Sequence, residues 1–247
     1  MKSPWLVGFG LVALAQLAFI ALHLPRLAVI ATWLLVPVVA VWVWRARGPK
    51  LLVLALMLCW AGDVLGNPAL IGIGPIGLFL SVAAYAIANV LLTILFIRCG
   101  ALTAWRTTFG GRQRWWAAVA VLCLVAAVVG LAFAWSSFDA VLRIVASIYL
   151  LLLVVTATTA FAVDTCAGIG AAMLLSSHLL VVLEVAGRLD GAATSFRLAV
   201  LALYALGILL IAVGVVNREP HSASSKTGPN TGLRNSAAAV GSGLRRS

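Results

Sequence analysis

Two ionisable side chains that interrupt long apolar runs are the strongest candidates for chemistry in this sequence. Asp63 lies near the end of one run, and His178 lies near the middle of another. A carboxylate can stabilise a developing positive charge or activate water, and an imidazole exchanges protons near neutral pH. An ionisable group inside a bilayer is costly, so it usually faces the interior of the bundle and marks a functional site. We therefore expect Asp63 and His178 to face each other across a polar chamber, separated by at most a water-sized gap.

Other polar side chains fall at similar depths in neighbouring runs. Ser177 and Glu184 are seven residues apart, which places them on one stripe of a helix. Each candidate also has a purely structural interpretation, because helical serines often bond their own backbone and tyrosines are common near helix ends. Glu184 can instead pair with Arg188, four residues further on. The candidates for supporting roles are Ser81, Tyr85, Tyr149, Ser177, Glu184 and Tyr204.

Motifs of soluble enzymes and metal sites are missing from the sequence. It has no Gly-rich phosphate loop, no G-x-S-x-G and no H-E-x-x-H. The four cysteines are scattered and form no C-x-x-C pair. We expect no metal, no cofactor and no disulfide framework.

Composition determines the class of protein that carries these residues. Of the 247 residues, 64% are hydrophobic and only 9% are charged, and the mean hydropathy is +1.16. Soluble domains have about 25% charged residues. The net charge of +11 comes from basic residues between apolar runs, which indicates contact with anionic lipid headgroups rather than with nucleic acid. The sequence predicts an all-α, polytopic membrane helix bundle.

Breaks at charges, glycines and prolines divide the chain into about eight spans. Each is near the ~20 residues that cross the hydrocarbon, except the short third span, after which 69–74 is either a re-entrant segment or a loop. The spans form a predicted transmembrane domain over 1–216, and 217–247 is predicted to be a disordered, basic cytoplasmic tail. The predicted spans are 5–22, 27–44, 51–65, 75–97, 115–135, 141–163, 167–186 and 197–216.

Charge asymmetry between the loops predicts the orientation. Of the 17 basic residues, 13 lie at the termini and in alternate loops, and only Arg26, Arg143, Arg188 and Arg197 lie on the other side. Basic residues accumulate on the cytoplasmic side. We therefore expect a multi-pass protein of the cell membrane with both termini in the cytoplasm.

An ordered series of motifs extends over about residues 27–216. Its most specific elements are Gly-Asp-Val-Leu at 62–65 and Phe-Leu-Ser followed by Tyr85 at 79–85. Pro37, Tyr149, Ser177 and Tyr204 continue the series. In order and spacing, these motifs resemble the YhhN-like family of eight-helix membrane proteins. The departures are at polar positions of the family pattern, where this chain has Val36, Val82, His178 and Ile208.

The resemblance implies an activity, because characterised members of that family are lysoplasmalogenases. They use water to cleave the vinyl-ether bond of a lysophospholipid, releasing a fatty aldehyde and a glycerophospho-alcohol. Asp63 matches the family aspartate and would be the carboxylate, and His178 occupies the second acidic position and would donate a proton. The tyrosines and Ser177 would bind water or the headgroup, and the partner would be a membrane lipid.

Two alternatives to this activity remain open. The apolar replacements at family positions favour a relative that has kept the bundle but lost or changed the chemistry, and that binds a lipid. A small transporter is the other alternative, although broken helices in both halves would be expected of one.

The orientation can be tested by cysteine labelling in intact cells. In a cysteine-free background, Asp190→Cys should react with a membrane-impermeant thiol reagent and Arg112→Cys should not. The reason is that the 13-to-4 asymmetry places the loop between the fourth and fifth spans, which contains Arg112, in the cytoplasm, and the loop that contains Asp190 outside. The reverse labelling pattern would overturn the orientation.

Overall fold

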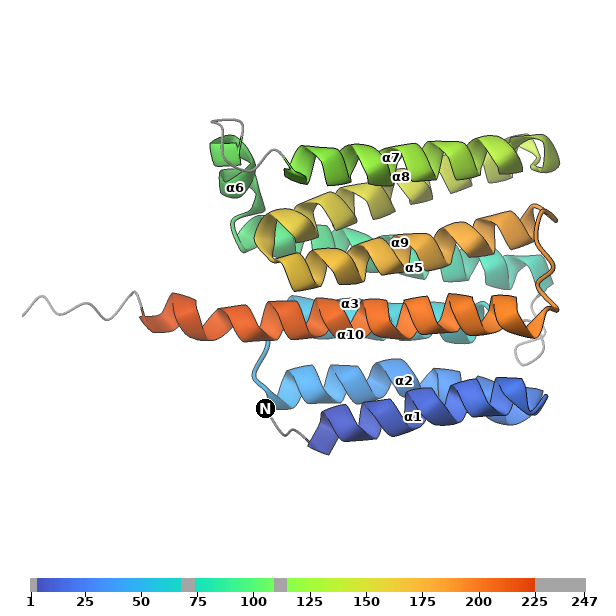
Figure 1. Ribbon diagram of the computed structural model, residues 1–247, viewed down its shortest axis with the longest axis horizontal. Coiled ribbons are helices and arrows are strands. Elements are labelled where there is room, and N and C mark those ends of the chain that lie inside the picture. Colours follow the sequence, from blue (N-terminus) through green and yellow to red (C-terminus); the bar gives the residue numbers. More distant parts are fainter. Residues whose placement is uncertain (1–3, 68–73, 109–114, 225–247) are drawn as a thin grey trace, which may run out of the picture. The chain divides into compact units, whose positions relative to one another are not determined.

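The computed structural model describes residues 4–67, 74–108 and 115–224, and this part of the chain contains helices and no strands (Figure 1). A helix lies at each predicted span, with bounds that differ by a few residues except at the end of the last one. In chain order the helices are α1 (Pro4–Ala21), α2 (Pro25–Arg45), α3 (Lys50–Leu65), α5 (Gly74–Arg98), α6 (Ala101–Thr108), α7 (Trp115–Ala134), the 3-10 turn η1 (Trp135–Ser137), α8 (Ala140–Val163), α9 (Thr165–Val185) and α10 (Thr194–Ser224).

Six of these helices, α2, α5, α7, α8, α9 and α10, are long and apolar enough to cross a membrane. α3 has 16 residues, and the apolar part of α1, Val7–Ala21, is also short. Large apolar side chains point outward along the bundle, for example Leu122, Phe133 and Ile148, each more than 60% exposed, and such a surface suits lipid. The chain therefore has the form of a multi-pass helical membrane protein, while the count of eight spans and the orientation stay predictions.

Two features differ from the predicted spans. The eight-residue helix α6 occupies the loop between the fourth and fifth spans. α10 continues to Ser224, past the predicted end at 216, because a helix satisfies its own backbone hydrogen bonds beyond the apolar run. The segment 69–74, predicted to be a loop or re-entrant, falls outside the described residues except for Gly74. The rest of the predicted tail, 225–247, also lies outside them.

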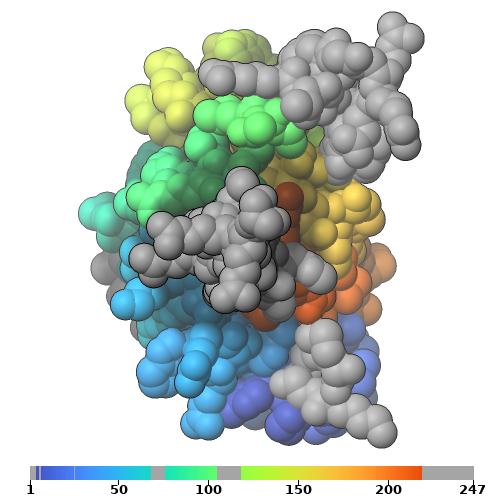
Figure 2. Space-filling view, turned by 90° about the vertical axis from the view of Figure 1, so that its left-hand side faces the viewer, coloured from blue at the N-terminus to red at the C-terminus, as the bar shows by residue number. Residues whose placement is uncertain are grey.

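Within Met1–Val216 the helices from α1 to α5 pack in chain order, and the later ones pack around α8. α1 contacts α2, α2 contacts α3, α3 contacts α5, and α5 contacts α8, which is flanked by α7 and α9. Figure 2 shows α1 and α2 (blue) at the bottom of this unit, and Figure 1 shows α7 and α8 on the side opposite to them. The central helices α3, α5, α8, α9 and α10 are the ones that carry the polar candidates.

α9 and α10 approach each other closely at a pair of glycines. A Cβ added to Gly170 would lie 2.6 Å from the Gly207 carbonyl oxygen, and a Cβ added to Gly207 would lie 2.8 Å from the Gly170 oxygen. Small residues let membrane helices pack backbone to backbone. This contact fixes the position of α10 along α9, and with it the depth of Tyr204.

The glycine contact predicts a stability difference between two alanine substitutions. Gly170→Ala should destabilise the protein by about 1–3 kcal/mol, because its Cβ would meet backbone atoms that cannot move aside. Gly10→Ala is the matched control, because nothing lies within 4 Å of its Cβ position. Thermal unfolding in detergent measures both, and equal midpoints would contradict the close approach of α9 and α10.

Candidate functional site

Asp63, on α3, receives hydrogen bonds from two tyrosines of other helices. The Tyr85 hydroxyl of α5 donates to Oδ1, and the Tyr204 hydroxyl of α10 donates to Oδ2 at 2.9 Å. Hydrogen bonds to a charged acceptor are the stronger kind, and they stabilise a carboxylate that an apolar bundle would otherwise exclude. Three helices therefore meet at the Asp63 carboxylate.

Gly62 allows Tyr85 to reach that carboxylate. A Cβ at Gly62 would lie 2.8 Å from the Tyr85 ring, so the ring packs where a side chain would otherwise be. One turn later, Gly66 leaves room for Ser81, whose hydroxyl donates to the Gly62 carbonyl oxygen at 2.8 Å. Gly62 in α3 and Gly66 just after it thus bring α5 close to Asp63.

His178 lies on the other side of the same tyrosines. The chain has three tyrosines, and all of their rings surround His178 edge-on, with centroid distances of 5.0 Å to Tyr85, 5.6 Å to Tyr149 and 6.2 Å to Tyr204. The His178 ring nitrogen Nδ1 lies 2.8 Å from the Leu174 carbonyl oxygen. Because a carbonyl oxygen only accepts, Nδ1 carries the hydrogen, and Nε2 is the nitrogen left to exchange a proton.

The hydroxyl groups of Tyr149 and Ser177 differ in their hydrogen bonding. The Tyr149 hydroxyl is buried and has no hydrogen-bond partner among the described residues. Ser177 donates to the Val200 carbonyl oxygen at 2.9 Å, so it joins α9 to α10 and has no hydrogen left for a ligand. The structure therefore leaves Tyr149 available to bind a ligand, and gives Ser177 a structural contact.

Asp63, His178 and the three tyrosines form one cluster. A cavity of about 110 Å³ borders this cluster between α5, α8 and α9. We call it the tyrosine cavity. Its polar lining is Ser81, Tyr85, Tyr149 and His178, and the rest is apolar, including Phe79, Phe138 and Val181. Asp63 does not line the cavity. The Tyr85 hydroxyl, which donates a hydrogen bond to its carboxylate, lies between that carboxylate and the cavity. The arrangement places a proton carrier and a phenol at an apolar cavity with a carboxylate behind them.

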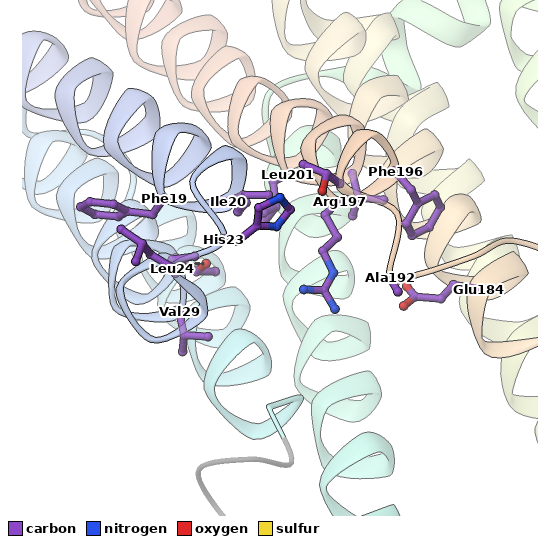
Figure 3. A pocket seen from close by; sticks show the side chains of 14 residues that line it. Phe19, Ile20, His23, Leu24, Val29, Glu184, Ala192, Phe196, Arg197 and Leu201 are labelled. Atoms are coloured by element: carbon purple, nitrogen blue, oxygen red, sulfur yellow. Dashed lines mark hydrogen bonds between the residues drawn. The ribbon is translucent and has the colours of Figure 1, made fainter.

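Glu184 does not join this cluster. It lines a second cavity, the Arg197 cavity, whose polar lining is His23, Thr32, Glu184, Thr194 and Arg197 (Figure 3). The alternative pairing with Arg188 is not formed either, because Arg188 Nε donates to the Phe133 carbonyl oxygen at 3.0 Å and its Nη2 to the Ser136 hydroxyl at 2.6 Å. Arg188 thereby binds the end of α7.

Two features of the structure were not predicted from the sequence. One is the role of Gly62, which makes room for the Tyr85 ring, and the other is the Arg197 cavity. A Gly-Asp pair inside an apolar run was the available signal for Gly62. His23 and Arg197 gave no signal, because each lies near a predicted span end, where such residues are common. In the described part of the chain, no group of three or more His, Cys, Asp or Glu side chains could hold a metal ion.

The chain matches a family model, that of the YhhN family, over residues 27–215. The match begins in α2 and ends in α10, so it includes every helix that contributes to the Asp63 and His178 cluster. No curated protein and no solved structure matches the chain.

The hydrogen bonds of the cluster predict opposite results for two tyrosine substitutions. Tyr204→Phe should destabilise the protein by about 1–3 kcal/mol, because the Asp63 carboxylate loses a donor in an apolar setting. Tyr149→Phe should leave the unfolding midpoint unchanged or raise it, because it removes a buried hydroxyl without a partner. An equal loss for both, measured by thermal unfolding, would contradict this hydrogen-bond pattern.

Proposed function

The chain belongs to the YhhN family, and from that premise we propose that it hydrolyses the vinyl-ether bond of lysoplasmalogen-type lysophospholipids within the membrane. The products are a fatty aldehyde and a glycerophospho-alcohol. The observation that carries the proposal is the cluster at the tyrosine cavity, where His178 and Tyr85 line the wall and Asp63 lies behind Tyr85. The expected cell-membrane location, with both termini in the cytoplasm, is part of the same proposal.

A vinyl ether is hydrolysed through a cation, and the cluster offers the groups that this route needs. A proton from Nε2 of the His178 imidazolium adds to the double-bond carbon remote from oxygen, leaving an oxocarbenium ion. Water adds to the carbon bonded to oxygen, its proton returns to Nε2, and the hemiacetal breaks into aldehyde and alcohol. The bond from Nδ1 to the Leu174 carbonyl oxygen holds the ring so that the same nitrogen gives and takes the proton.

The Asp63 carboxylate stabilises the positive charge of this intermediate. Its negative charge reaches the cavity through the Tyr85 hydroxyl, in surroundings of low polarity where a fixed charge has a large effect. The Tyr149 hydroxyl, which has no partner among the described residues, is placed to bind the attacking water or the ether oxygen. Supporting roles remain for Ser81 at the cavity wall and for Tyr204 on Asp63.

A lipid-binding protein with altered chemistry is the second candidate. Val36 and Ile208 occupy positions where the family pattern is polar, and both lie in the hydrophobic core at no more than 1% exposure. Val82, at a third such position, lines the tyrosine cavity. These three side chains supply no hydrogen bond to a substrate, which favours a changed reaction.

Aldehyde release from a lysoplasmalogen by the purified protein in detergent distinguishes the two candidates. Asp63→Asn should lower the rate of aldehyde release by about 10²–10³-fold, because the amide keeps the shape of the carboxylate but has no charge facing the cation. Asp164→Asn is the matched control, since that residue caps α9 through the Ala167 N–H and asparagine caps equally well. Release that survives Asp63→Asn would mean that another carboxylate acts.

Substitutions of His178 test the proton donor in the same assay. His178→Ala should lower the rate by about 10²-fold or more, and His178→Asp, the usual residue type of the family, should keep or raise it. If folded wild-type protein releases no aldehyde from any vinyl-ether lipid, the hydrolase proposal fails and the lipid-binding candidate replaces it.

A further inference from the structure

The Arg197 cavity is the larger of the two cavities and shares no lining residue with the tyrosine cavity. Its volume is about 370 Å³, and it lies between the α1–α2 turn, the end of α9 and the start of α10. This is the predicted outer end of the bundle. Most of its wall is apolar, including Phe19, Leu24 and Leu201, and its charged side chains are those of Glu184 and Arg197.

Arg197 extends into this cavity between His23 and Glu184 (Figure 3). Its Nε donates to the Gly191 carbonyl oxygen at 2.8 Å, which holds the guanidinium in place. Within the described residues its terminal nitrogens have no hydrogen-bond or ion-pair partner. A planar guanidinium with two free nitrogens matches the oxygens of a phosphate.

Glu184, near the end of α9, supplies the negative charge in this cavity. Its carboxylate packs against Gly191 in the space that a Cβ would occupy. The described part of the chain shows no ion pair between Glu184 and Arg197. Gly191 therefore positions both groups, through its carbonyl oxygen for Arg197 and through its missing side chain for Glu184, and keeps the two charges separate.

We propose that the Arg197 cavity binds the headgroup of a zwitterionic phospholipid or lysophospholipid. The phosphodiester contacts the guanidinium of Arg197 and the imidazole of His23, and the amine contacts the carboxylate of Glu184. The hydrocarbon chain begins along Phe19 and Leu24 and continues into the bilayer. Charge complementarity carries the assignment, because one free cation and one free anion beside an apolar wall match a ligand of both charges with an apolar chain.

The test is equilibrium binding of ester-linked lysolipids to the full-length protein in nanodiscs. These lipids have no vinyl ether, so the result is independent of the proposed hydrolysis. Arg197→Gln should weaken binding of lysophosphatidylethanolamine and lysophosphatidylglycerol by about five- to tenfold, and should leave monoacylglycerol, which lacks a phosphate, unchanged. Glu184→Gln should weaken only lysophosphatidylethanolamine, because lysophosphatidylglycerol has no amine.

Two further variants locate the effect. Arg143→Gln is the matched control, because Arg143 also donates through Nε to a backbone carbonyl oxygen, that of Trp135 at 3.0 Å, and does not line the cavity. It should bind all three lipids as the wild type does. Asp164→Asn should also bind lysophosphatidylethanolamine normally, because Asp164 caps the other end of α9 through the Ala167 N–H and does not line the cavity.

Several outcomes would overturn the proposal. Equal affinity of the wild type for lysophosphatidylethanolamine and monoacylglycerol would show that the cavity binds only apolar chains. An equal loss with Arg143→Gln and Arg197→Gln would show a general charge effect. A Glu184→Gln protein that keeps full affinity for lysophosphatidylethanolamine would reject amine recognition.

Discussion

The structure depends on a carboxylate that lies among apolar helices and must be stabilised there. Asp63 meets this requirement with two phenol hydrogen bonds, one from α5 and one from α10. Each donor is useful only if its helix has the right depth and rotation, so the requirement of one side chain constrains three helices. Gly62 sets the approach of α5, and the Gly170–Gly207 contact sets the depth of α10 along α9. His178 then joins the cluster because its helix is the one that α10 packs against.

The tyrosine cavity and the Arg197 cavity differ in their polar chemistry and in their depth within the bundle. The tyrosine cavity has uncharged hydroxyls and an imidazole, with the charge of Asp63 one hydrogen bond away. The Arg197 cavity has exposed charges at a helix end, where water lowers the cost of keeping them ionised. A deep site with little free charge suits a reaction of a nearly apolar bond, and a surface site with both charges suits recognition of a headgroup.

Much of the fold could be predicted from the sequence because the hydrocarbon thickness fixes the length of each apolar run. Depth within a helix follows from that length, which is why the amino-acid sequence alone places Tyr85, Tyr149, Tyr204 and His178 at one level. Rotation about the helix axis does not follow from length. The role of the glycine that admits Tyr85 emerges only from the packing of α3 against α5.

Glu184 shows that two residues on one face of a helix can differ in burial. Its spacing from Ser177 correctly indicates a shared face, since Ser177 binds α10 and Glu184 contacts Gly191 just before α10. Seven residues also correspond to a rise of about 10 Å along the helix. That rise separates a buried hydroxyl from an exposed carboxylate, so the two residues belong to different environments although they face the same way.

The link between Asp63 and Tyr204 also has a consequence for biosynthesis. These residues are 141 positions apart, and Tyr204 belongs to α10, the last helix in the described part of the chain. α3, with 16 residues and an aspartate, is synthesised long before that partner exists. During translation the carboxylate therefore depends on α5 alone or on water at the membrane surface. The second hydrogen bond to Asp63 can form only after the ribosome has released α10. A nascent chain that stops short of that helix therefore has no complete cluster.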